Sequence, residues 1–169
     1  PFIIADGPDN PGGGGYADGT LILKALMDAD INSALLTLIY DSESVDACIE
    51  AGEGSRIRLS IGGKSAPEIL GGAVCCEAKI IKITDGRYKN RGPMNPGLQM
   101  DLIGTALVDI DGIRVILVKN PTQPYDVALL ELHDIEPEKE NIIVLKSAVH
   151  FRGAYEEIAG KIVQVSYPS

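Results

Sequence analysis

Several residue types are scarce in this sequence, and each scarcity narrows the class of protein. The 169 residues include no tryptophan and only two phenylalanines, so the core must consist mainly of Ile, Leu, Val and Ala. The three cysteines, Cys48, Cys75 and Cys76, have neither the even count of a disulfide framework nor the spacing of a zinc site. We expect reduced, buried thiols, with the adjacent pair on opposite faces of a strand.

Positive charge and long apolar runs are also scarce. Lys and Arg number 15 against 24 Asp and Glu, which gives a net charge of -9. Such a chain repels a phosphate backbone and an anionic membrane, so we expect neither a nucleic acid nor a membrane as partner. Because no apolar run approaches the ~18 residues of a spanning helix and no signal peptide is visible, we expect a cytoplasmic protein. The start at Pro1 suggests a fragment of something longer.

The apolar pattern predicts a single α/β domain with a mixed β-sheet and flanking helices, in which two β-α-β-like ends enclose a central antiparallel hairpin section. The first half alternates strand and helix, which favours parallel strands with right-handed crossovers. Asp111-Gly112 is a strong hairpin signal. We expect strands at 2–5, 34–39, 56–61, 74–83, 98–110, 113–118, 142–145 and 162–165, and helices at 19–29, 41–52, 125–132 and 151–159.

The first of these helices has an apolar stripe at helical spacing and a plausible N-cap at Asp18. The stripe consists of Leu21, Ile22, Ala25, Leu26 and Ala29.

A glycine-rich loop between the first strand and this helix is the most unusual feature of the chain. Consecutive glycines lose much entropy on folding, so they are expected where backbone must turn or approach another group closely. Amides at a helix start favour negative charge. We therefore expect the loop to bind an anion or polar ligand; the alternative is a flexible connection without a ligand. The residues proposed for this role are Asp9, Asn10, Gly12, Gly13, Gly14 and Gly15.

Two known phosphate motifs match the glycine loop incompletely. The spacing of a P-loop is present, but Thr20 occupies the position of the essential lysine. A dinucleotide-binding pattern fits better, with Asp41 at the end of the next strand as the ribose-binding acid. Four consecutive glycines match many such patterns, so the match is weak support for a dinucleotide-binding site.

A second candidate motif follows the buried strand at 142–145 and opens the helix expected at 151–159. Ser147 can cap that helix, whereas the cations beside it are disfavoured by the helix dipole unless they face an anion or a carboxylate. The alternative is a structural histidine and a surface arginine. The candidates are Lys146, Ser147, His150 and Arg152, with His150 as the candidate catalytic residue. If both motifs lie at the carboxyl edge of the sheet, they share one crevice.

The remaining polar candidates are weaker. Asn95 and Lys64 are loop residues that could border a site. His133 lies late in a short predicted helix, where a cation suits the dipole, so we expect a structural role. Two histidines seventeen positions apart do not make a metal site, and we expect none in this chain.

Three motifs, in this order, resemble the C-terminal domain of the microcystinase-C-like (MlrC) metallopeptidases. The resemblance covers essentially the whole chain. The motifs are Asp9-Asn10-Pro11-Gly12-Gly13-Gly14-Gly15, then Gly92-Pro93-Met94-x-Pro96-Gly97-Leu98-Gln99-x-Asp101-Leu102, then Lys146-Ser147-x-Val149-His150-Phe151-Arg152.

This resemblance implies a zinc-dependent hydrolase of amide or peptide bonds, a family known best for opening linearised microcystin fragments. In that family the metal ligands lie mainly in a larger N-terminal domain, so the resemblance implies zinc for the whole enzyme and no cofactor in this domain. The implied partners are that N-terminal catalytic domain and a peptide-like or carboxylate-bearing small substrate. Formation of a homo-oligomer is left open.

Three classes of function follow from these observations. The chain is the accessory domain of a metallohydrolase, inactive alone; or it is a self-contained module that binds an anion or dinucleotide; or it is a purely structural domain. The first two predict that the glycine loop and His150 meet at an open pocket. The third predicts that the loop is packed away from solvent.

Overall fold

The computed structural model describes residues 1–167 and has the expected α/β architecture. Within these residues a mixed eight-stranded sheet has the order β10-β1-β9-β2-β8-β7-β4-β3, and β5 and β6 form a separate two-stranded sheet. The strands are β1 (Phe2–Asp6), β2 (Ala34–Tyr40), β3 (Arg56–Ile61), β4 (Val74–Thr84), β5 (Arg87–Lys89), β6 (Gln99–Asp101), β7 (Thr105–Ile110), β8 (Ile113–Val118), β9 (Ile142–Leu145) and β10 (Lys161–Val165). The helices are α1 (Leu21–Asp28), α2 (Ser42–Ala51), α3 (Pro67–Leu70), α4 (Ala128–Glu131) and α5 (Arg152–Tyr155), with short 3-10 turns η1 (Pro11–Gly13) and η2 (Pro137–Lys139).

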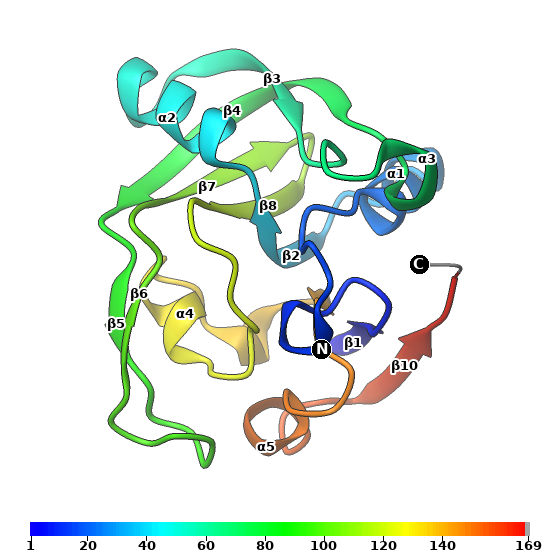
Figure 1. Ribbon diagram of the computed structural model, residues 1–169, viewed down its shortest axis with the longest axis vertical. Coiled ribbons are helices and arrows are strands. Elements are labelled where there is room, and N and C mark those ends of the chain that lie inside the picture. Colours follow the sequence, from blue (N-terminus) through cyan, green and yellow to red (C-terminus); the bar gives the residue numbers. More distant parts are fainter. Residues whose placement is uncertain (168–169) are drawn as a thin grey trace.

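Helices cover both faces of the main sheet, and each face has its own apolar core. On one face, Leu23 and Leu26 of α1 and Val45 of α2 pack against the sheet. On the other, Leu129 of α4 and Tyr155 of α5 pack against it. In Figure 1, α1, α2 and α3 lie in the upper half of the view, and α4 and α5 lie in the lower half. Because the central strands are buried on both faces, they are the continuous apolar runs seen in the sequence.

Five strands, β10, β1, β9, β2 and β8, lie parallel to one another, so their carboxyl ends share one edge. The central hairpin is confirmed: β7 and β8 are antiparallel, and Asp111 (φ 50°) and Gly112 (φ 93°) form the turn between them. Gly112 is required there, because a Cβ would lie 2.2 Å from the carbonyl oxygen of Asn32.

The order of the strands differs from the simple β-α-β-α-β expectation. The strand β9, more than a hundred residues away in sequence, lies between β1 and β2, where the Thr37 hydroxyl donates to the Val144 carbonyl. The strand β3 is not parallel to these strands but pairs antiparallel with β4 at the sheet edge. Its alternating pattern, exposed on one face, suits an edge position.

Several expected elements have different bounds. The strand expected at 98–110 is divided into β6 and β7, because Ile103 (φ 63°) and Gly104 (φ 131°) have left-handed backbone that no strand can continue through. The strand β6 pairs with β5, which the sequence analysis missed, and Figure 1 shows this pair as an arm beside the main sheet. The helices expected at 125–132 and 151–159 are reduced to the single turns α4 and α5.

The N-cap and the apolar stripe expected for the first helix are wrong in detail. Thr20, not Asp18, occupies the N-cap position of α1. The Asp18 carboxylate instead accepts hydrogen bonds from the amides of Lys64 and Ser65, at 2.9 and 2.8 Å. The residues of α1 that are fully buried are Leu23 and Leu26, whereas Ala25 and Ala29 are exposed.

The cysteines follow the expectation only in part. Cys48 is buried and Cys76 is partly buried, and burial raises the pKa of each thiol to about 11. Cys75 is exposed, on the opposite face of β4 from Cys76. In the described part of the chain no helix has the length and apolar character needed to cross a bilayer.

His133 has a structural role, as expected, but as a neutral residue and not as a cation at a helix end. It follows α4, is 3% exposed, and its Nε2 atom lies 3.1 Å from the Thr105 hydroxyl. Burial, with a smaller effect of Lys82, lowers the pKa of His133 to about 4.

This buried histidine predicts a loss of stability in mild acid. An unfolded chain protonates His133 near pH 6.5 and the folded chain only near pH 4, so stability falls as the pH falls through that window. The expected contribution is about 3 kcal/mol in the free energy of unfolding. The free energy of unfolding, measured by urea titration at each pH from 7 to 4, should fall less steeply with pH for His133→Gln than for the wild type. Parallel curves of stability against pH would contradict the assignment.

Candidate functional site

The glycine loop connects the end of β1 to α1 and folds around its own backbone. The Asn10 side chain accepts from the Gly12 amide at 2.9 Å, and the Asn10 carbonyl accepts from the amides of Gly13 and Gly15, both at 2.9 Å. Gly15 must be glycine, since a Cβ there would lie 2.7 Å from the backbone carbon of Asp9. The Gly14 amide donates to the Pro11 carbonyl, so the four glycine amides are used within the loop.

The Asp9 carboxylate occupies the position in which a bound anion was expected. It is 1% exposed and accepts from the amides of Ala17 and Gly19, at 2.8 and 2.7 Å. The loop thus surrounds an anion, but this anion is a side chain of the protein itself. The dinucleotide alternative also loses its ribose acid, because Asp41 caps α2 by accepting from the Ser44 amide at 3.1 Å.

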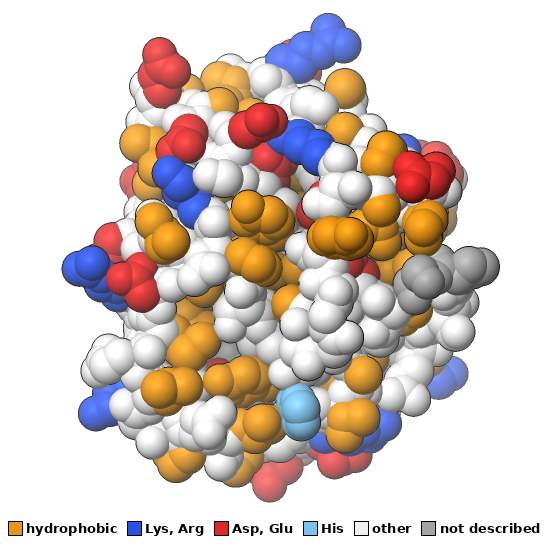
Figure 2. All heavy atoms as spheres, viewed as in Figure 1, with side chains coloured by type: hydrophobic (Ala, Val, Ile, Leu, Met, Phe, Trp, Pro, Cys, Tyr) orange, Lys and Arg blue, Asp and Glu red, His pale blue; other side chains and the backbone are white. Residues whose placement is uncertain are grey.

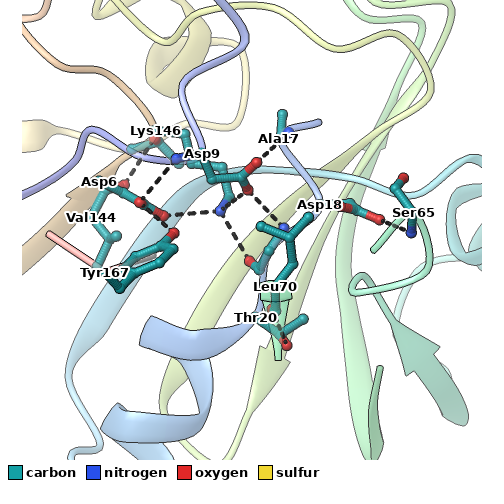
Figure 3. Close-up of polar contacts among 12 residues, drawn as sticks. Asp6, Asp9, Ala17, Asp18, Thr20, Ser65, Leu70, Val144, Lys146 and Tyr167 are labelled. Carbon is teal, nitrogen blue, oxygen red and sulfur yellow. Dashed lines mark hydrogen bonds and ion pairs between the residues drawn. The ribbon is translucent and has the colours of Figure 1, made fainter. Parts of the chain in front are cut away.

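Lys146, at the end of β9, completes this buried network. Its ammonium group lies 2.7 Å from Asp9 Oδ2 and 3.1 Å from Asp6 Oδ2, and donates to the Gly19 carbonyl at 2.9 Å. The Tyr167 hydroxyl donates to Asp6 Oδ1 at 2.6 Å, and burial raises the pKa of that tyrosine, so the proton stays on the phenol. Figure 3 shows these side chains converging from the ends of the chain. Because its three donors are satisfied internally, Lys146 offers no free positive charge.

Two further candidate cations, Arg152 of the second motif and the loop residue Lys64, are also paired. Arg152 forms an ion pair with Glu156 at 2.8 Å and stacks over the Phe151 ring. Lys64 bridges Asp41 and Glu43, at 2.8 Å each. These cations therefore face carboxylates of the chain itself. Whether they contact a substrate stays a prediction.

The glycine loop and the 146–152 motif meet directly through Lys146 and Asp9, and they meet a second time at Gln123. Its amide nitrogen donates to the Ser147 hydroxyl at 3.1 Å, and its amide oxygen lies 2.9 Å from His150 Nδ1. On the loop side, a Cβ at Gly12 would lie 2.6 Å from that same oxygen. Ser147 is not the residue that caps α5, but its hydroxyl accepts from the Phe151 amide at 3.4 Å.

The segment 123–126 also holds the arm formed by β5 and β6. The Asp126 carboxylate accepts from the amides of Arg91 and Gly92, at 2.9 and 2.8 Å. The Tyr125 hydroxyl accepts from Asn90 at 3.3 Å and, more weakly, from Asn95 at 3.5 Å. All three motifs quoted above therefore contact one four-residue segment.

The apolar pattern did not reveal this segment, because most of it lies between the strand expected at 113–118 and the apolar part of the helix expected at 125–132. A signal was present. The polar residues Gln123, Tyr125 and Asp126 follow the carboxyl end of a buried parallel strand, which is where α/β proteins place functional residues.

Two small pockets open beside Asp9 and Asp18. One, of about 210 Å³, lies against the glycine loop and is lined by Pro8, Tyr16 and Ile69 among others. The second, of about 230 Å³, is lined by Asp18, Tyr40 and Lys64 among others. Tyr16 is 57% exposed, so the loop is not packed away from solvent. Figure 2 shows apolar side chains across the middle of one face, with charged side chains mainly around its periphery.

The described residues, 1–167, offer no ligand set for a catalytic metal. Among residues 1–167 there is no group of three or more His, Cys, Asp or Glu side chains arranged to hold an ion. Asp6 and Asp9 already share the Lys146 ammonium, and the exposed His150 is hydrogen-bonded to the Gln123 amide and not to a carboxylate. Zinc, which the resemblance implies, therefore has no ligand set in the described residues.

The fold and site define a class: an α/β domain whose parallel strands β1 and β9 direct two loop motifs to one edge, where Asp126 holds the third motif, on the β5–β6 arm. The chain belongs to the family described as MlrC C-terminus, whose model matches residues 4–169. It is 26% identical over 167 residues to Microcystinase C of Sphingomonas sp., covering 98% of this chain and 32% of that protein.

A crystal structure of a protein from Mesorhizobium sp. BNC1, which carries a provisional name as a metallopeptidase, has the same fold. The TM-score is 0.90 at 22% identity, over 99% of this chain and 33% of that one. The chain thus spans about a third of the length of both proteins.

The buried ion network predicts a large effect of removing its cation. Lys146→Met would leave Asp6 and Asp9 as two uncompensated buried carboxylates, and the expected loss is about 3–5 kcal/mol in the free energy of unfolding. The matched control is Lys139→Met, which removes an exposed pair with Glu136 and should cost less than about 1 kcal/mol. Urea titrations measure the free energy of unfolding of both variants. Equal losses for Lys146→Met and Lys139→Met would show that the buried network is not stabilising.

Proposed function

We propose that this chain works as the C-terminal domain of a zinc-dependent hydrolase of amide or peptide bonds and forms one wall of its substrate cleft. The observation that carries the proposal is the meeting of the glycine loop, Gln123 and His150 at the carboxyl edge of the parallel strands. Membership of the MlrC C-terminus family supports the reaction class. On this proposal the metal and its ligands belong to a separate N-terminal domain, and the isolated chain is inactive.

The wall offers a specific set of groups to a substrate. The imidazole of His150 is exposed and is hydrogen-bonded to Gln123 through Nδ1. It can accept or donate a hydrogen bond at a carboxylate or scissile amide of the substrate. The pocket beside Tyr16 and Ile69 offers apolar contact and glycine backbone. We propose a peptide-like substrate, because a pocket lined mainly by apolar side chains and glycine backbone suits a peptide better than a highly charged anion.

A purely structural domain is the second candidate, and one observation favours it. The glycine amides are satisfied within the loop, so the loop does not need a ligand to complete its hydrogen bonds. The self-contained anion-binding module is less well supported for the same reason. The two remaining candidates differ in what they predict for His150.

The test compares the protein encoded by the full reading frame, including any metal-bearing domain, with the 169-residue chain. Linearised microcystin and unrelated linear peptides serve as substrates, and zinc content is measured on the same samples. The full protein should hydrolyse a peptide and hold zinc, and the chain alone should do neither. Tight zinc binding with hydrolysis by the chain alone would contradict the proposal.

His150→Ala in the full protein should lower kcat by about 10²-fold, as expected on loss of a positioned acid–base group, with zinc content unchanged. The matched control is Lys139→Met, a surface change near η2, which should leave the rate unaltered. A wild-type rate for His150→Ala would favour the structural domain.

A further inference from the structure

His150 is exposed at the surface, but one edge of its ring is held in place. The Nδ1 atom lies 2.9 Å from Oε1 of Gln123, a side chain that is 9% exposed. The opposite edge of the imidazole, with Nε2, faces away from that contact. A hydrogen bond at one ring nitrogen decides which nitrogen carries the proton in the neutral ring.

The chemistry of this contact fixes the proton. A carboxamide oxygen only accepts hydrogen bonds, so the Nδ1 atom that faces it must donate. We infer that Gln123 is a positioning residue that holds neutral His150 as the Nδ1–H tautomer, which leaves the Nε2 lone pair directed outward as a hydrogen-bond or proton acceptor. The catalytic use of that lone pair rests on the proposed function, whereas the tautomer does not.

The surroundings of Gln123 hold its amide in place. Its nitrogen donates to the hydroxyl of Ser147, a fully buried residue whose amide is itself bonded to the Leu145 carbonyl at 2.8 Å. On the other side the amide abuts Gly12, where a Cβ would overlap both Oε1 and the amide carbon, at 2.6 and 2.8 Å. The amide is therefore enclosed between β9 and the glycine loop.

The glycine loop thus acquires a role that its hydrogen bonds alone do not suggest. Gly12 provides the space that Gln123 occupies, and through Gln123 it sets the state of His150. This connection links Gly12 to His150, more than 130 positions apart in the sequence, through the single side chain of Gln123.

Nitrogen-15 NMR of the 169-residue chain tests the inference directly. The chain has two histidines, and His150→Gln assigns the signals. At a pH where both rings are neutral, long-range proton–nitrogen correlations should show the His150 proton on Nδ1. Gln123→Met, similar in size but without an acceptor, should shift His150 toward the Nε2–H tautomer that free imidazoles prefer. Gln123→Glu retains the acceptor and should retain the Nδ1–H tautomer.

Two neighbouring glycines provide a matched pair of variants. Gly12→Ala should displace the Gln123 amide and reproduce the tautomer change of Gln123→Met. Gly13→Ala should not, because its Cβ would meet only the Asn10 amide nitrogen, at 3.4 Å. His133, buried against Thr105, should keep its signals in all of these variants and serves as the internal reference.

Two results would overturn the inference: an Nε2–H tautomer in the wild type, or an unchanged tautomer in Gln123→Met. Kinetics of the full protein then test the link to function separately. Gln123→Met should lower kcat about tenfold with little change in KM, and Gln123→Glu should restore much of it. A tautomer that shifts without any change in kcat would leave Gln123 as the positioning residue but refute the proposed function of His150.

Discussion

The ammonium group of Lys146 lies between two buried carboxylates, and this contact joins the ends of β1 and β9 to the start of α1. Burying three charges is expensive, and Coulomb attraction repays it only where the remaining protons and lone pairs are also satisfied. Here they are: the carboxylates accept from the Ala17 and Gly19 amides and from the Tyr167 hydroxyl. The network is satisfied in one arrangement, and that arrangement fixes the path of the glycine loop.

Four consecutive glycines are then explained by packing and not by flexibility. Gly15 lies so close to Asp9 that a side chain would overlap its backbone, and Gly12 leaves room for Gln123. The entropy lost in ordering these residues is offset by the close approach that only glycine permits. A loop with its amides already bonded and its one anion already neutralised presents a rigid surface with little net charge. Such a surface suits the wall of a cleft better than a phosphate-binding site.

Much of the fold could be predicted from the sequence because it is encoded locally. The apolar runs that became β2 and β9 and the Asp111-Gly112 turn need no knowledge of distant residues. Strand order could not be predicted in this way. The insertion of β9 between β1 and β2 depends on pairing across more than a hundred residues, and periodicity carries no information on pairing. The lengths of α4 and α5 were overestimated. The helical spacing of apolar residues continues beyond each helix into turns that also pack against the core.

The site was predictable to a similar degree. A cation beside a helix start suggested that Lys146 faces an anion, which is true, but charge pattern alone could not show that the anion is Asp9. Gln123 could not be found by such an argument at all. It is uncharged, it belongs to no periodic element, and its importance comes from what it touches: Ser147, His150 and Gly12.

The segment 123–126 gives the three family motifs a common physical basis. Each motif is a loop, and an isolated loop lacks the packing to hold a side chain in one orientation. Gln123 fixes the glycine loop against the 146–152 segment, and Asp126 fixes the turn of the β5–β6 arm through two backbone amides. Because one short segment contacts all three, their relative positions are determined by a few hydrogen bonds at the edge of a rigid sheet. The role proposed for this chain, as one wall of a substrate cleft, requires that kind of fixed geometry.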